Sequence, residues 1–418
     1  MEKGTGLSPY RWLILVAIVP IIISTEMMWL SLAPISSMAE SYYGISSMSV
    51  ALFSMSYMIM YIIFSLPASW VVDKFGYRYS LITGALITSV FGLTRAVFAD
   101  NFTIVLASQF IIAIGQPFLL NISTKVPANW FPVSERSTAA GILTMAQYIG
   151  FAVPMVLAPV LAETWGIPFT FKIFAIIALI SAATAIIFTR ERPKVPPPGP
   201  IAPKDDLSLS SIKKLFANKA FFLVLFICFI SMGIFNTLLT LIESILLPRG
   251  ISSAQAGIVG AVFVVAGVAG AIILPVISDK LGKRAPFFVA AIALLIPVYL
   301  GFTFVNSFVL VAIFAGIAGF SIMGVAPVLF QHGSEVAYPV QEGTSLGIIL
   351  LMGQISGALF VYLFEILQNA SGSVILPMLA VVALNAIVLP FALGIKESGL
   401  VNTKGAFNPP KEISVKKY

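Results

Sequence analysis

Apolar residues occur along the chain in runs of about 20, separated by short polar, glycine-containing or proline-containing segments. An α-helix of about 20 residues crosses the roughly 30 Å of bilayer hydrocarbon. The runs lack the alternation of apolar and polar positions that is typical of a transmembrane β-barrel. The pattern therefore predicts an all-α integral membrane protein with twelve transmembrane helices, at residues 12–36, 48–72, 80–98, 103–127, 137–162, 168–188, 221–247, 254–278, 286–304, 308–332, 344–367 and 373–393.

One long polar segment, residues 189–219, interrupts this pattern in the middle of the chain. It contains five prolines between Pro196 and Pro203, followed by Asp205 and Asp206, a composition typical of an extended linker. The predicted organisation is a bundle at 1–189, a linker at 190–219, a second bundle at 220–395 and a tail at 396–418. The first apolar run is too long for a signal peptide and lacks a small-residue cleavage site after it, so we expect it to be retained as a helix.

The composition excludes a soluble globular enzyme. Hydrophobic residues make up 59% of the chain, charged residues only 10%, and the mean hydropathy is +1.02. The single cysteine, Cys228, and the single histidine, His332, exclude a disulfide framework, an iron–sulfur cluster and a zinc site built from cysteines or several histidines. We therefore expect no enzymatic activity, no metal and no cofactor, and proton coupling is one option for the transport cycle.

The positive charges predict the orientation of the helices. Arg95, Lys172 and Arg249 fall at one set of helix ends, whereas the other 21 of the 24 lysines and arginines fall on the opposite side. The positive-inside rule then places both termini and the linker in the cytoplasm of a cell whose plasma membrane holds the protein. The same distribution accounts for the net charge of +7 through lipid headgroups, without a nucleic-acid partner.

Two motifs occur once in each half of the chain. Asp73-Lys74-x-Gly76-x-Arg78 in the first half is matched by Asp279-Lys280-x-Gly282-Lys283-Arg284 in the second, 206 residues later. A longer match aligns the segment from Phe131 through Glu135 to Gln147 and Gly150 with the segment from Tyr338 through Glu342 to Gln354 and Gly357. Two parallel six-helix repeats predict a pseudo-two-fold axis along the membrane normal and a cavity between the halves.

With its twelve helices, central linker and paired Asp-Lys loops, the chain resembles the major facilitator superfamily over almost its whole length. Within that superfamily it is similar to the feline leukaemia virus subgroup C receptor-related family, whose members move haem, choline or ethanolamine. The motifs that carry this similarity are Tyr10-Arg11-Trp12, Trp29, Tyr57-Met58-x-x-Tyr61, Pro67-Ala68-x-Trp70, Trp130-Phe131 and Glu335-x-x-Tyr338-Pro339-x-x-Glu342-Gly343-Thr344-Ser345-x-Gly347. The resemblance implies that Trp29, Gln147 and Gln354 line a substrate site.

A carboxylic acid near the middle of the first helix is the strongest candidate for function, because ionisable groups are costly inside a membrane. Glu26 lies three residues before Trp29, so both side chains share one helical face. A carboxylate beside an indole ring suits an organic cation, through charge pairing and a cation–π contact. The alternative is a protonated Glu26 that is hydrogen-bonded to a neighbouring helix.

Further polar and aromatic side chains complete the predicted substrate site. Gln147 and Gln354 occupy equivalent repeat positions, and interhelical hydrogen bonds are the alternative role for them. Gln116 is followed by Pro117, which offers helix bending as another explanation. Where choline-moving members of the family have a second aromatic residue in the seventh helix, this chain has Asn236. The candidates are therefore Trp29, Glu26, Gln147, Gln354, Asn236, Phe235, Gln116, Tyr57 and Tyr61.

Charges in the repeated loops are candidates for a cytoplasmic gate. We expect Asp73 to pair with Arg78 and Asp279 with Arg284, and ion pairs of this set to hold the halves together when the cavity faces outward. Solvated loop charges are the alternative. The full gating set is Asp73, Arg78, Asp279, Arg284, Glu135, Arg136 and Glu342. Glu243 and Arg95, near outer helix ends, form a candidate counterpart on the other side.

The predicted function is alternating-access carriage of a small organic cation or amine in a central cavity, by a monomer in a lipid bilayer. A proton-coupled exporter of amphipathic compounds and a haem-related carrier are the alternatives. Haem is the weaker of these, because His332 is expected to be solvated at the cytoplasmic end of the tenth helix.

Overall fold

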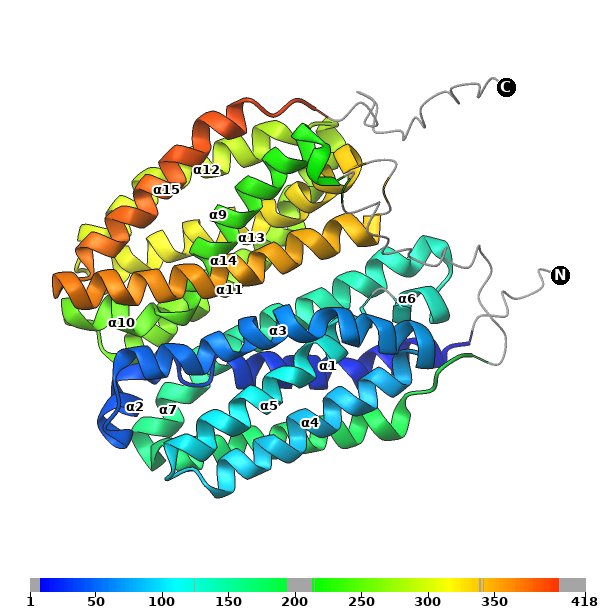
Figure 1. Ribbon diagram of the computed structural model, residues 1–418, viewed down its shortest axis with the longest axis horizontal. Coiled ribbons are helices and arrows are strands. Elements are labelled where there is room, and N and C mark those ends of the chain that lie inside the picture. The colour runs from blue at the N-terminus through cyan, green and yellow to red at the C-terminus, as the bar shows by residue number, and fades with distance from the viewer. Residues whose placement is uncertain are drawn as a thin grey trace.

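Helices account for all the regular structure in the described part of the chain. The computed structural model describes residues 8–123, 125–193, 213, 215–337, 340 and 342–397. The N-terminal half contains α1 (Tyr10–Trp29), η1 (Ala33–Ile35), α2 (Ser36–Tyr43), α3 (Ser47–Phe75), α4 (Tyr77–Val97), α5 (Phe102–Leu120), α6 (Lys125–Trp130) and α7 (Val133–Phe188). The C-terminal half contains α9 (Lys219–Thr240), α10 (Ile242–Leu246), η2 (Leu247–Arg249), α11 (Ser253–Leu281), α12 (Ala285–Phe304), α13 (Phe308–Ala337), α14 (Glu342–Ser371) and α15 (Ile375–Leu393). The two halves lie side by side in Figure 1.

Twelve helical segments of the described chain are long enough to span a bilayer. Eleven described helical stretches are long and apolar enough to span a bilayer. One of them, α7, has 56 residues and is broken at Gly166, where φ is 81° and ψ is 169°. This backbone conformation is open to glycine and turns the chain back on itself, so α7 supplies both the fifth and the sixth crossing. The predicted all-α membrane fold with two six-helix bundles is confirmed.

The first and seventh crossing helices end earlier than predicted. The sequence pattern predicts helices over 12–36 and 221–247, but α1 ends at Trp29 and α9 ends at Thr240, and short helical segments follow each of them. After α1 the chain enters η1, which contains Pro34. A continued helix would bring its ring against the carbonyl group of Leu30, four residues earlier.

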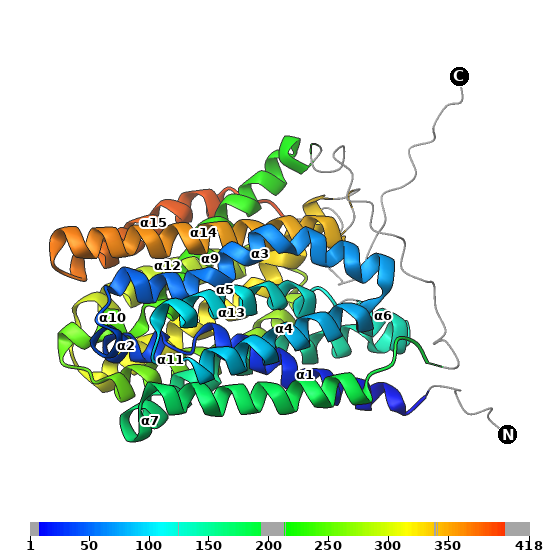
Figure 2. The ribbon, with the colours of Figure 1, turned by 60° about the horizontal axis from the view of Figure 1, so that its bottom comes forward.

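The repeat is visible in the elements themselves, at the same offset of 206 residues as the loop motif. Helices α3 and α11 both have 29 residues, and Ser46 and Ser252 cap their first turns with side-chain oxygens. Gly166, between the fifth and sixth crossings, corresponds to Gly372, between α14 and α15, and both have positive φ. Figure 2 shows that the helices of both bundles run along the long axis of the molecule. The linker boundaries remain a prediction, because residues 194–212 and 214 lie outside the described part.

The halves contact each other most closely toward the end of the molecule where α2 and α10 lie, which is the predicted outer end (Figure 1). Helix α7 packs against α11, and α3 packs against α14. The approach of α7 to α11 is backbone to backbone, since a Cβ added to Gly257 would lie only 2.1 Å from the carbonyl oxygen of Met155. The predicted outer end is therefore closed.

We expect Gly257→Ala to separate α7 from α11, because the added methyl group meets a helix backbone that cannot rotate away. Overpacking of this kind costs about 1–3 kcal/mol, and the melting temperature of the purified protein should fall. Gly347→Ala in α14 is the control, because no atom lies within 4 Å of the Cβ it would add and alanine favours a helix by about 0.5–1 kcal/mol. Equal melting temperatures for the two variants would contradict the close contact.

Candidate functional site

Glu26 lies at the centre of the N-terminal half with no exposed surface. Both of its carboxyl oxygens accept hydrogen bonds from Nε2 of Gln116 in α5, at 3.1 and 3.0 Å. On the other side α7 presses against it, since a Cβ on Gly150 would lie 2.5 Å from the Cβ of Glu26. Among the described residues, no lysine or arginine forms an ion pair with Glu26.

The bond from Gln116 agrees with both interpretations of Glu26, because an amide N–H group can donate to an ionised or to a protonated acid. It also gives Gln116 a defined role, as the partner that fixes the Glu26 side chain between α1 and α5. What the site lacks is a resident positive charge, and a buried carboxylate without one is stabilised by a proton or by a cationic ligand.

Aromatic rings cover Glu26 on the side of the predicted outer end. Trp29 stacks on Tyr57, with ring centroids 6.0 Å apart, and receives the edge of Phe151 at 5.4 Å. Its Nε1 donates to the carbonyl oxygen of Ser54 at 2.9 Å, so the ring orientation is fixed. Phe151 then contacts Phe235 of the C-terminal half at 6.3 Å. The ring series therefore joins the two halves above the candidate site.

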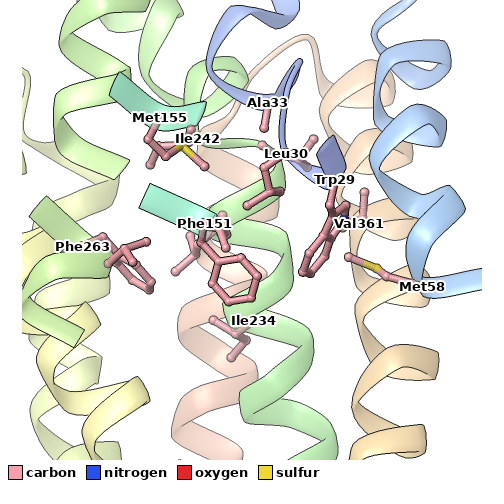
Figure 3. Close-up of a cluster of buried hydrophobic side chains, with 14 of the residues drawn as sticks. Trp29, Leu30, Ala33, Met58, Phe151, Met155, Ile234, Ile242, Phe263 and Val361 are labelled. Atoms are coloured by element: carbon pink, nitrogen blue, oxygen red, sulfur yellow. The ribbon is translucent and has the colours of Figure 1, made fainter. Parts of the chain in front are cut away.

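Figure 3 shows how this series continues into an apolar cluster between the halves. The N-terminal half contributes one set of buried side chains and the C-terminal half the other. The labelled members are Trp29, Leu30, Ala33, Met58, Phe151 and Met155 on one side and Ile234, Ile242, Phe263 and Val361 on the other.

The remaining predicted substrate residues do not join the Glu26–Trp29 group directly. Asn236 is buried and donates to the carbonyl oxygen of Gly353 at 3.4 Å, next to Gln354. The Tyr61 hydroxyl donates to Asn121 at 3.3 Å. Gln147 and Gln354 are both half-buried, and no hydrogen bond joins one to the other in the described structure. Their substrate role stays a prediction.

Arg95 lies in the last turn of α4, near the outer helix end where the sequence placed it, and it is a buried cation. It has no exposed surface, its guanidinium group lies 4.4 Å from the ring centroid of Phe171, and it donates to the amide oxygen of Gln109 and to the carbonyl oxygen of Met28. It makes no contact with Glu243. A positive charge at the last carbonyl groups of α1 is favourable, so Arg95 secures the helix end that carries Trp29.

The repeated loops differ from each other in their ion pairs. Asp279 pairs with Arg284, as expected, and Arg284 also reaches Glu335 at 3.3 Å. In this conformation Asp73 pairs with Lys125 at 3.2 Å and not with Arg78, and the pairing expected in the outward-facing state stays a prediction. Lys125 begins α6, a short helix that the sequence pattern did not predict.

Two other gate candidates, Glu135 and Arg136, also contact residues of their own half. Glu135 pairs with Arg11 at 3.1 Å, and Arg136 donates to the carbonyl oxygen of Phe131 at 3.2 Å. The side chain of Glu342 lies outside the described part of the structure. Between described side chains, each ion pair at the predicted cytoplasmic end joins residues of one half. This end therefore lacks described ionic bridges, whereas the opposite end is closed.

Two carboxylates that the sequence analysis did not identify accept hydrogen bonds from the backbone at the loop motifs. Glu191, just after α7, accepts from the backbone N–H groups of Tyr77 and Arg78, at 3.3 and 2.8 Å. Glu397, just after α15, accepts from those of Arg284 and Ala285 at 3.0 to 3.1 Å. An acidic group at a helix N-terminus satisfies free N–H groups and complements the helix dipole. The 206-residue offset relates the two glutamates and was the available signal.

His332 is not the solvated terminal residue that the sequence suggests. Only 1% of it is exposed, because α13 continues to Ala337, and its ring packs 5.5 Å from that of Phe288. Within the described chain no group of three histidine, cysteine or acidic residues is placed to hold a metal ion.

Comparisons with known proteins agree with this architecture. The Major Facilitator Superfamily model matches residues 11–361. An uncharacterized MFS-type transporter of Caenorhabditis elegans is 30% identical over 400 residues, which cover 89% of this chain and 68% of the relative. The rat choline/ethanolamine transporter FLVCR2 is 28% identical over 84% of this chain and 68% of its own length. The family resemblances drawn from the sequence motifs are confirmed.

A solved structure of a transporter has the same fold. A bacterial homolog of the human lysosomal transporter Spinster, in an inward-facing and unoccupied conformation, superimposes with a TM-score of 0.77. The superposition covers 93% of this chain and 98% of that chain, at 16% sequence identity.

We expect Gln109→Leu to destabilise the protein by about 3 kcal/mol, because it removes the acceptor that faces a fully buried guanidinium group. Gln109→Glu is the matched control, since it keeps an oxygen opposite Arg95 and adds a negative charge. Thermal unfolding of the purified variants measures the difference. If the leucine variant melts no lower than the glutamate variant, the amide of Gln109 is not what balances Arg95.

Proposed function

This chain belongs to the major facilitator superfamily, and we propose that it carries a small organic cation or amine of the choline or ethanolamine class. As a multi-pass transporter of this superfamily it works by alternating access. The proposal rests above all on Glu26, a fully buried carboxyl group that no described lysine or arginine neutralises.

The chemistry around Glu26 favours a cation over an anion. The carboxylate offers charge pairing, and Trp29 in the next turn of α1 and Tyr57 in α3 have the electron-rich rings that bind substituted ammonium groups. The one buried arginine nearby, Arg95, is already engaged by Gln109 and by the carbonyl oxygen of Met28. Its guanidinium group also lies 4.4 Å from the ring centroid of Phe171, so it does not supply an anion site.

Named relatives support the same class of substrate. Rat and human FLVCR2 and the feline FLVCR1, which are named choline/ethanolamine transporters, are 27 to 28% identical to this chain. The chain keeps a tryptophan in the first helix but has Asn236 where choline-moving members have an aromatic residue. Asn236 adds an amide, which favours an amine that can donate hydrogen bonds.

A proton is the second cation that can neutralise Glu26. When no amine is bound, a protonated Glu26 with its bond to Gln116 leaves no uncompensated charge in the membrane. Competition between amine and proton for one carboxyl group would couple their movements in opposite directions. Facilitated transport without a proton is the simpler case, and it needs only the amine.

The cytoplasmic gate fits the same cycle. In the described conformation Asp73, Arg284 and Glu135 pair within their own halves. In the outward-facing state the halves meet at this end, and the same charges become available to pair across the interface. Both termini then lie in the cytoplasm, with the protein a monomer in the plasma membrane.

The test is ligand binding by the purified protein, followed as the rise in melting temperature. We expect choline or ethanolamine to stabilise it, and 3,3-dimethyl-1-butanol, which replaces the choline nitrogen by carbon, to have no effect. Glu26→Gln keeps the acceptor for Gln116 but removes the charge. It should weaken amine binding by roughly 30-fold, about the 2 kcal/mol of a desolvated charge contact.

Variants of the ring partner provide the control for this test. Trp29→Phe keeps a ring face and should retain much of the binding, whereas Trp29→Ala should lose it. Betaine, whose own carboxylate meets Glu26, should bind more weakly than choline. Stabilisation by haem or by simple carboxylates, with no response to any amine, would refute the cation proposal and leave the transporter fold unaffected.

A further inference from the structure

Glu243, in α10, is a second fully buried carboxyl group, and it lies between the halves at the predicted outer end. Its Oε2 accepts from the hydroxyl of Ser36 at 2.8 Å and from the backbone N–H group of Ser37 at 2.9 Å. Its Oε1 accepts from the hydroxyl of Ser37 at 2.5 Å and from that of Ser253. Ser36 and Ser37 belong to the N-terminal half, whereas Glu243 and Ser253 belong to the C-terminal half.

This arrangement requires two acceptor oxygens. The backbone N–H group of Ser37 can only donate, so Oε2 must accept, and the three hydroxyl groups complete a set of four donors. Hydrogen bonds to an ionised acceptor are roughly twice as strong as neutral ones. An amide in place of the carboxylate would keep one acceptor oxygen, and its NH₂ group could only donate to the hydroxyl groups of Ser37 and Ser253, so the bonds to a charged acceptor would be replaced by weaker neutral ones.

The position of Glu243 connects these bonds to the transport cycle. It follows the end of α9 at Thr240, and Ser36 follows the end of α1 at Trp29. Helix α10 packs against η1 and α2 of the other half and against α11 of its own half. Opening toward the outside separates these elements, and it cannot occur while the bonds of Ser36 and Ser37 to Glu243 persist.

We propose that the Glu243 carboxylate is the latch of the outer gate, and that release of Ser36 and Ser37 from it permits the outward-facing state. The inference rests on the alternating access of the proposed function but not on the identity of the substrate.

A second buried glutamate supplies a matched control. Glu365 in α14 also reaches across the halves, accepting from the hydroxyl of Ser47 at 2.7 Å through Oε2, while its Oε1 accepts no hydrogen bond. A glutamine at this position keeps an oxygen for Ser47. The same chemical change should therefore release the gate at Glu243 and leave it closed at Glu365.

The experiment measures opening with a cysteine at Ala33. Ala33 lies in η1, is 2% exposed, and is placed beside Leu30 in the interface between the halves (Figure 3). Protein in lipid nanodiscs, reachable from both faces, is treated with a charged maleimide, and the rate of alkylation is followed by mass spectrometry. The parent protein, whose single cysteine Cys228 is buried, gives the background.

In the Ala33→Cys background, Glu243→Gln should speed alkylation roughly 10-fold, the shift expected when a charge-assisted hydrogen bond is lost. Glu365→Gln should stay within about 2-fold of the parent rate, since its single bond is retained. The double variant Ser36→Ala, Ser37→Ala removes two donors without altering the carboxylate. It should also speed alkylation, and it decides the matter if Glu243→Gln does not fold.

Alkylation that is no faster in Glu243→Gln and in the double serine variant than in the Ala33→Cys parent would overturn the latch. An equal increase in the two glutamine variants would do the same, because it would show general loosening of the interface. Amine binding measured on the same samples separates the two proposals. Absence of amine binding by the parent protein would refute the proposed substrate, and the alkylation rates would still test the latch.

Discussion

The absence of water inside the bilayer is the constraint on which the rest of this structure depends. A polar group buried in hydrocarbon must find its partner within the protein, and three ionisable side chains show how this is done. Arg95 is matched by an amide, a carbonyl group and aromatic rings. Glu243 is matched by four donors from both halves. Among the described residues, Glu26 accepts side-chain hydrogen bonds only from Gln116, which makes it the group most in need of a mobile cation.

The sequence predicts the fold well because the membrane imposes a strong pattern. Bilayer thickness accounts for the runs of about 20 apolar residues and the short polar segments between them. The lipid headgroups and the positive-inside rule account for the charge asymmetry. The ends of α1 and α9 could not be predicted in the same way, since helix ends inside protein are set by packing and by single residues. Hydropathy does not distinguish a helix that ends at Trp29 from one that continues to residue 36.

The candidate site was predicted in its residue types and only partly in its contacts. Glu26 and Trp29 follow from their shared helical face, but the bond from Gln116 depends on how α1 and α5 pack, which spacing does not reveal. Arg95 lies in the last turn of α4 as predicted, but its burial was not predicted, because an arginine within a few residues of a helix end resembles a loop charge. The glutamates that cap the loop motifs, Glu191 and Glu397, were missed although the 206-residue repeat relates them.

One short segment connects the candidate binding group with the outer closure. Between Glu26 and Ser37 the chain carries the buried acid, the Trp29 ring, Pro34 in η1 and the two serines held by Glu243. Arg95 and Gln109 both bond to the carbonyl oxygen of Met28, so this segment is fixed at its centre as well as at its end. A displacement of Trp29 by a bound cation would therefore act on a segment whose other end holds the gate. The two halves are similar in fold because of the repeat. They differ in the polar residues of the segment between Glu26 and Ser37.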